Sequence, residues 1–183
     1  NGESVYSATY TMQSSDNTGT VAFTVDFSDM ANNDGTQVTA VANDADGGVT
    51  FDKQAPSFTA VTIASNNSND ATLAVVNDVI TVNLTSDEAI KTGADPTVTV
   101  NSNTATVTRN SAVSFTATYT MSSPADDAID GSSIPINISS YTDATGNAGS
   151  TVTATTDGSA VTYDKTVPTL GTVTISSDNT YDH

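Results

Sequence analysis

The chain has 183 residues, no cysteine and a formal net charge of −17, from 21 acidic and only 4 basic residues. This balance excludes a nucleic-acid binder, which needs a basic surface to neutralise phosphates, and it excludes binding to an anionic membrane surface. Metal cations are the natural counter-charge, whereas disulfides and thiolate metal sites are excluded because cysteine is absent.

The first 53 residues alternate apolar and polar side chains. The stretches "VYSATYTM" from Val5 and "VAFTVDF" from Val21 place apolar residues at every second position, which predicts half-buried antiparallel strands. Clusters of Asn, Asp, Gly and Ser between them predict turns. We interpret residues 1–53 as the last three strands of a β-sandwich unit that begins upstream of this chain.

The region 54–165 carries the longest series of alternating stretches and turn signals. The expected strands are 57–64, 73–85 with a kink at Asn77-Asp78, 96–101, 103–109, 113–121, 134–141 and 150–163. No stretch has apolar residues at helical spacing over three turns, so no helix longer than one turn is expected. Seven such strands predict an all-β fold, and specifically a complete immunoglobulin-like β-sandwich.

Two long phrases show that the chain repeats itself. "VTFDKQAPSFTAVTIASNN" from Val49 recurs as "VTYDKTVPTLGTVTISSDN" from Val161, so that Asp52 recurs as Asp164, 112 residues further on. Residues 166–183 are therefore predicted to supply the first strand of a following repeat. The apolar faces of the partial repeats need covering sheets. The expected partners are adjacent repeats of the same chain or neighbouring copies of it.

Several short motifs stand out in the chain: "FDKQAP" at 51–56, "YDKTVP" at 163–168, "ATYTM" at 8–12 and 117–121, "TSDEAI" at 85–90 and "TDATGNAG" at 142–149. These motifs resemble the bacterial Ig-like tandem repeats of long extracellular surface proteins, of the adhesin, biofilm-associated, surface-layer or filament type. The resemblance implies tandem Ig-like sandwiches, an extracellular cell-surface location, a spacer or fibre role, and calcium at domain junctions. The first copy differs, because "SDMANNDG" from Ser28 has no glycine at the position of Gly146.

Acidic side chains are expected to converge at one pole of the complete repeat. In a seven-stranded sandwich, the loops after the second and sixth strands lie at the same end as the incoming linker. The candidate metal ligands there are Asp52, Asp87, Glu88, Asp143 and Asn147. They suit Ca²⁺, which takes six to eight oxygen ligands. The alternative is that they are solvated surface charges, or that Asp143 is a turn former bonded to nearby backbone N–H groups.

The opposite pole carries a second acidic group, Asp126, Asp127 and Asp130, near Asp164. A complete metal site is less expected there. Sequons make Asn66, Asn83 and Asn137 candidate N-glycosylation sites, and the alternation places Asn83 and Asn137 towards solvent.

Catalysis is not expected. The single histidine is His183, the last residue, and the absence of cysteine removes any Cys–His pair. No apolar run approaches the roughly 18 residues of a membrane helix, so membrane insertion is not expected either. The favoured function is a structural, non-catalytic repeat segment of a long extracellular fibre, surface layer or adhesin stalk. The alternative is a ligand-binding adhesin module that recognises glycan or protein, which the scarcity of aromatic residues disfavours.

Overall fold

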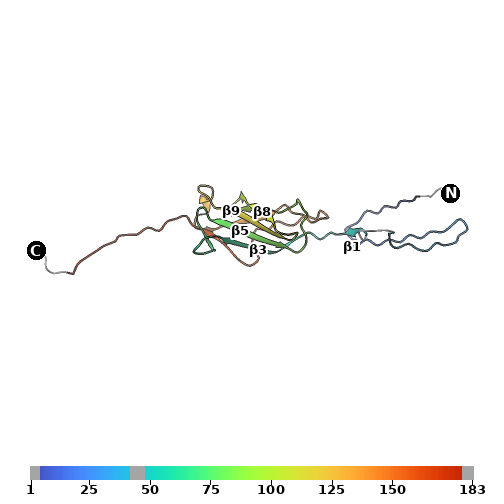
Figure 1. Cartoon of the computed structure of the whole chain (residues 1–183), viewed down its shortest axis with the longest axis horizontal. Coiled ribbons are helices and arrows are strands. Elements are labelled where there is room, and N and C mark those ends of the chain that lie inside the picture. The colour runs from blue at the N-terminus through green and yellow to red at the C-terminus, as the bar shows by residue number, and fades with distance from the viewer. Residues whose placement is uncertain (1–4, 42–47, 179–183) are drawn as a thin grey trace.

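The computed structural model describes residues 5–41 and 48–178. In these residues the only regular element that is not a β-strand is a three-residue 3-10 turn, η1 (Asp127–Ile129). The predictions of an all-β fold and of no helix longer than one turn are therefore confirmed. Figure 1 shows a central body of strands with the N-terminal segment at one end and the C-terminal segment at the other. The described residues include no helix long and apolar enough to cross a membrane.

One layer of the central body is an antiparallel sheet with strand order β3-β5-β9-β8 (Figure 1). Its strands are β3 (Phe58–Ser65), β5 (Val79–Ser86), β8 (Thr106–Arg109) and β9 (Ser114–Thr120). In β5, Ile80, Val82 and Leu84 are buried, whereas Asn83 and Thr85 are exposed. This alternation is what a strand with one buried face requires, because successive side chains point to opposite sides.

Two three-stranded sheets, β11-β6-β7 and β10-β12-β4, contribute the remaining strands. These strands are β4 (Leu73–Ala74), β6 (Thr97–Val100), β7 (Asn103–Thr104), β10 (Ser132–Ser133), β11 (Ile136–Ser139) and β12 (Thr162–Tyr163). Their inward residues join those of the four-stranded sheet in one apolar core that extends from Val61 to Tyr163. The arrangement is consistent with a β-sandwich.

The predicted strand 73–85 is broken at its expected kink. Asn77 adopts a φ of 76°, and the Oδ2 atom of Asp78 accepts a hydrogen bond from the Val75 N–H at 2.8 Å. The break allows β4 to leave β5 and pair with β12. β4 thus joins a different sheet from β5, and its pairing with β12 there is parallel, although only antiparallel strands were expected.

The predicted strand 150–163 is wrong over most of its length. Only an isolated bridge at Val152 and the short β12 pair in a sheet there. Between them, side-chain hydroxyls take over part of the pairing, since Thr156 Oγ1 accepts from the Val61 N–H and Ser159 Oγ accepts from the Ile63 N–H, both at 3.0 Å. One backbone hydrogen bond remains, from the Thr156 N–H to the Val61 carbonyl at 2.9 Å. Hydroxyls that bond to backbone groups in this way compete with regular strand pairing.

The N-terminal segment contains short pairings that correspond to pairings within residues 54–165. β1 (Gly19–Thr20) pairs with β2 (Thr50–Phe51) as β10 pairs with β12. The Val25–Val38 bridge likewise corresponds to the bridge between Ile138 and Val152. Three full strands were predicted here, but the described residues form only these short pairings and a bridge between Ser28 and Asp34.

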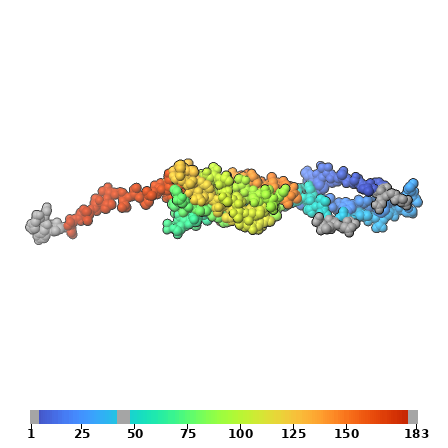
Figure 2. All heavy atoms as spheres, turned by 45° about the horizontal axis from the view of Figure 1, so that its top comes forward, coloured from blue at the N-terminus to red at the C-terminus, as the bar shows by residue number. Residues whose placement is uncertain are grey.

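Both end segments expose their apolar side chains. Tyr10 and Phe27 are 69% and 56% exposed, and Leu170 is 89% exposed. Figure 2 shows the C-terminal segment extending away from the central body without a covering layer. The repeat boundaries predicted at residues 54 and 165 stay a prediction.

Candidate metal centre

The loop 142–149 presents Asp143 at one pole of the sandwich. The Asp143 side chain is buried, and its Oδ1 atom accepts hydrogen bonds from the N–H groups of Thr145, Gly146 and Asn147 at 2.9, 2.6 and 2.8 Å. Gly146 allows this tight turn because its φ of 99° is unfavourable for other residues. Burial raises the pKa of the Asp143 carboxyl, but the hydrogen bonds from Asn147, Thr145 and Gly146 outweigh burial and lower it. Asp143 is therefore ionised at neutral pH.

Glu88 approaches from the loop that follows β5, and the Ser86 hydroxyl donates to its carbonyl at 2.6 Å. Its Oε1 atom is buried and has no hydrogen-bond partner among the described residues. Burial raises the pKa of the Glu88 carboxyl, and the negative charges of Asp52, Asp143 and Asp87 raise it further. A buried carboxylate oxygen of this kind lacks a compensating partner, which a cation would supply.

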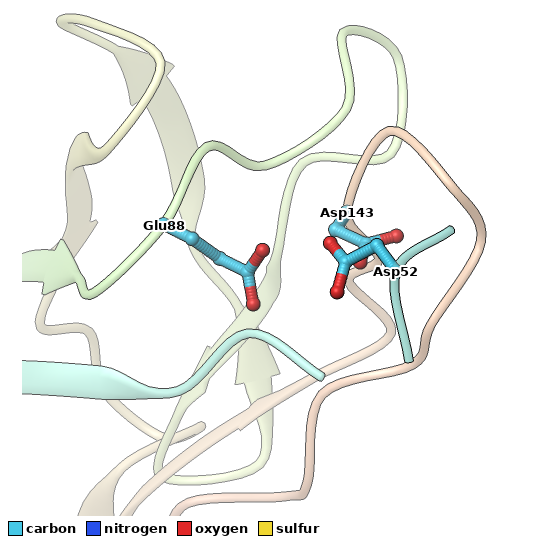
Figure 3. Close-up of side chains that lie close together, drawn as sticks. All are labelled: Asp52, Glu88 and Asp143. Atoms are coloured by element: carbon cyan, nitrogen blue, oxygen red, sulfur yellow. The ribbon is translucent and has the colours of Figure 1, made fainter. Parts of the chain in front are cut away.

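Asp52 reaches the same pole from the linker that follows β2. Its Oδ1 atom accepts from the Gln54 N–H at 2.9 Å, and its carbonyl accepts from the Asn147 side chain at 3.3 Å. One carboxylate oxygen each of Asp52, Glu88 and Asp143 lies within 4.8 Å of the other two, and Figure 3 shows the three side chains converging. This junction cluster, as we call the three acids, could hold a metal ion.

Two of the five predicted ligands lie outside the junction cluster. Asp87 turns to the start of β3, where its carboxylate accepts from the N–H and the hydroxyl of Ser57 at 2.8 and 2.7 Å. These hydrogen bonds lower the pKa of Asp87. Asn147 donates its side-chain N–H groups to Asp143 Oδ2 at 2.7 Å and to the Asp52 carbonyl. Asn147 therefore holds two of the acids in place as a donor.

The acidic loop occurs a second time, in the N-terminal segment. The carboxylate of Asp29 accepts hydrogen bonds from the backbone N–H and the side-chain amide of Asn33, both at 2.8 Å, as Asp143 does from its own asparagine. Asn32 has a φ of 64° at the position that corresponds to Gly146. Asparagine tolerates this left-handed conformation better than most residues. The missing glycine therefore leaves this loop geometry intact.

At the opposite pole, Asp126 is satisfied by neutral donors. It is completely buried and accepts hydrogen bonds from Asn101, Asn103, Tyr119 and Ser122. This buried role of Asp126 was not predicted from the sequence. A signal for it lies in the repeat, because Tyr10 and Asp16 recur as Tyr119 and Asp126, and the Tyr10 hydroxyl also donates to Asp16, at 3.2 Å.

The other two acids of that pole hold the outgoing linker. Asp127 pairs with the Lys165 ammonium at 2.6 Å, which lowers the pKa of Asp127 and raises that of Lys165. Asp130 accepts from the Lys165 N–H and the Thr166 hydroxyl, both at 2.8 Å. In the described part of the chain, this pole contains no further set of three acids close enough to share an ion.

The three candidate glycosylation sites are exposed. Asn83 Oδ1 accepts from the Thr116 hydroxyl at 3.2 Å, and Asn66 Oδ1 accepts from the Val79 N–H at 2.7 Å. Asn137 alternates with the buried Ile136 and Ile138. Modification of the three asparagines stays a prediction.

No family model matches the chain, and no curated protein or solved structure matches it either. The function is therefore inferred from the junction cluster and from the internal repeat. His183, the single histidine of the sequence, lies outside the described residues.

Proposed function

We propose that this chain is a structural, non-catalytic segment of tandem Ig-like repeats from a long extracellular surface protein. The repetition of local structure supports this role. The same strand pairings, the same acidic loop and the same linker sequence occur in successive copies. A chain of such units is suited to span a distance, as in a stalk, filament or surface layer, because each unit contacts mainly its neighbours.

We further propose that Ca²⁺ binds the junction cluster. The observation that carries this proposal is the buried, unpartnered Oε1 of Glu88 within an all-carboxylate group. Carboxylate oxygens suit a hard cation, and Ca²⁺ tolerates irregular geometry that waters and backbone carbonyls complete. Zinc is a poorer fit, since its protein sites favour histidine and cysteine ligands.

The position of the cluster suggests a mechanical consequence. Asp52 belongs to the linker, whereas Glu88 and Asp143 belong to the complete repeat. A shared cation would tie the linker to the repeat and restrict the angle between successive units. Asp164, which recurs at the position of Asp52, would serve the next junction in the same way.

The alternative function, a module that recognises glycan or protein, has less support. Binding faces are typically enriched in accessible aromatic side chains. In the complete repeat, Phe115, Tyr141 and Tyr163 are buried, and the Phe58 ring packs against Tyr141 with centroids 4.7 Å apart. These side chains stabilise the sandwich and leave no aromatic platform on its surface.

Two experiments test the proposal. Calcium titration of the chelator-treated chain should show about one saturable site, and Asp52→Asn should weaken it more than Asp70→Asn does. Asp70 is the matched control because it lies beyond the far end of β3 and only caps its own turn. Absence of binding at millimolar calcium would contradict the metal proposal. Electron microscopy of the native assembly should show thin, beaded fibres or stalks, and compact particles would contradict the structural role.

A further inference from the structure

Arg109, the only arginine of the chain, ends the edge strand β8 and lies over the ring of Phe115. The guanidinium carbon is 4.8 Å from the ring centroid. Because Phe115 is completely buried, its ring gives the guanidinium a fixed surface to pack against. Its N–H groups are thereby aimed at the loop between β5 and β6, which also carries Glu88.

Three groups of this loop accept hydrogen bonds from the Arg109 guanidinium. Nη1 donates to the Ile90 carbonyl at 3.1 Å, and Nη2 donates to the Lys91 carbonyl at 2.9 Å. The Asp95 carboxylate accepts from Nε at 2.9 Å and also pairs with Nη2. A planar fork of donors can satisfy all three acceptors together, which a lysine ammonium cannot do with the same geometry.

The segment that Arg109 holds is connected to Glu88 and Asp143, the two acids of the junction cluster that lie in the complete repeat. Ile90 forms a β-bridge with Asp143, and the Lys91 N–H donates to the Thr142 carbonyl at 2.9 Å. Glu88 lies two residues before Ile90 in the same loop. Arg109 therefore fixes the carbonyl groups of residues 90 and 91. The bridge to Asp143 and the hydrogen bond to Thr142 connect the same two residues to the loop that carries Asp143.

We propose that Arg109 is a positioning residue of the junction metal site, which sets the separation of Glu88 and Asp143 and thereby the affinity for calcium. This inference rests on the proposed calcium binding. Three carboxylates whose oxygens lie within 4.8 Å of one another repel when no cation is bound, so the loop of Glu88 needs an anchor. Arg109 anchors it from outside the cluster. Its own charge is matched by Asp95, so it does not compete with the metal ion for the three acids.

The test compares calcium dissociation constants by chelator competition, at a temperature where every variant is folded. Arg109→Met keeps a flexible apolar stem over Phe115 but removes the fork. It should raise the dissociation constant by about 10- to 100-fold, the usual effect of losing a group that orients metal ligands. Arg109→Lys should also bind more weakly than the wild type. Asp95→Asn keeps the fork and its bonds to the two carbonyls, so it should bind closer to the wild type than either arginine variant.

A merely structural role of Arg109 would lower the melting temperature in chelator and leave the dissociation constant of the folded protein unchanged. That result would overturn the inference and leave the metal site standing. If the wild-type chain binds no calcium, the proposed site fails and the inference fails with it. If Arg109→Met does not fold, Arg109→Lys decides the question, and wild-type affinity in that variant overturns the proposal. Terbium luminescence sensitised by tyrosine gives a second readout of the same site.

Discussion

Replacing Glu88 with glutamine should stabilise the chain without calcium and reduce the further stabilisation that calcium gives. Glu88 has a buried oxygen without a partner and two acidic neighbours in the junction cluster. The substitution removes one of three like charges and preserves the size of the side chain. It also removes a ligand that the calcium ion needs.

The magnitude follows from the geometry of the cluster. For unit charges 4.8 Å apart, the repulsion is ~0.9 kcal/mol in bulk water and ~3.5 kcal/mol at an effective dielectric constant of 20. Asp52 and Glu88 are partly exposed, so the lower part of this range applies to them. Glu88→Gln removes two of the three repulsive pairs and should stabilise the calcium-free chain by roughly 1–3 kcal/mol. Calcium at 100 times its dissociation constant should stabilise the wild type by about 2.7 kcal/mol.

The assay is thermal unfolding followed by tyrosine fluorescence, since the chain has no tryptophan and Tyr141 and Tyr163 are buried. In chelator, Glu88→Gln should melt several degrees above the wild type, as expected from about 2–8 °C per kcal/mol for domains of this size range. In millimolar calcium, its gain in melting temperature should be smaller than that of the wild type. Asp70→Asn should leave the calcium increment unchanged. A lower melting temperature of Glu88→Gln in chelator, or equal calcium increments in both proteins, would refute the reasoning.

Three further predictions concern pH, packing and a buried carboxylate. Because the folded pKa of Glu88 is raised, its charge destabilises the folded chain above that pKa. In thermal melts across pH, the calcium-free wild type should therefore gain stability relative to Glu88→Gln as the pH falls through the raised pKa towards the ordinary value near 4.3. In calcium titrations, the affinity of the wild type for calcium should fall over the same pH interval. Gly149→Ala should cost about 1–3 kcal/mol in urea unfolding, because a Cβ atom there would lie 1.9 Å from the Tyr141 ring, and a cost below 0.5 kcal/mol would contradict this close packing. Asp126→Asn should lower the free energy of unfolding by about 1–3 kcal/mol in the same assay, because the new amide N–H group would face existing donors such as the Tyr119 hydroxyl. Unchanged stability would contradict the assigned hydrogen-bond network.

The periodicity of the sequence was enough to predict the all-β fold and the inward faces of its strands. Ile80, Val82 and Leu84 are all buried because every second side chain of a strand points to the same face, here the core. The pole at which Glu88, Asp143 and Asp52 meet could also be predicted. Counting strands determines the end of the sandwich at which each connecting loop lies, and the linker enters at the same end.

Only the tertiary structure decided which acids at that pole face one another. Asp87 and Glu88 are adjacent in the sequence, yet Asp87 turns to the donors of Ser57, 30 residues earlier, while Glu88 faces the cluster. The irregular stretch before β12 has a similar cause, since Thr156 bonds to Val61 from 95 residues away. The period-2 pattern of a strand indicates which side chains are buried, because residues two apart point to the same face of the sheet. The direction of a loop side chain depends on donors and charges that distant segments supply, and these come together only in the folded chain.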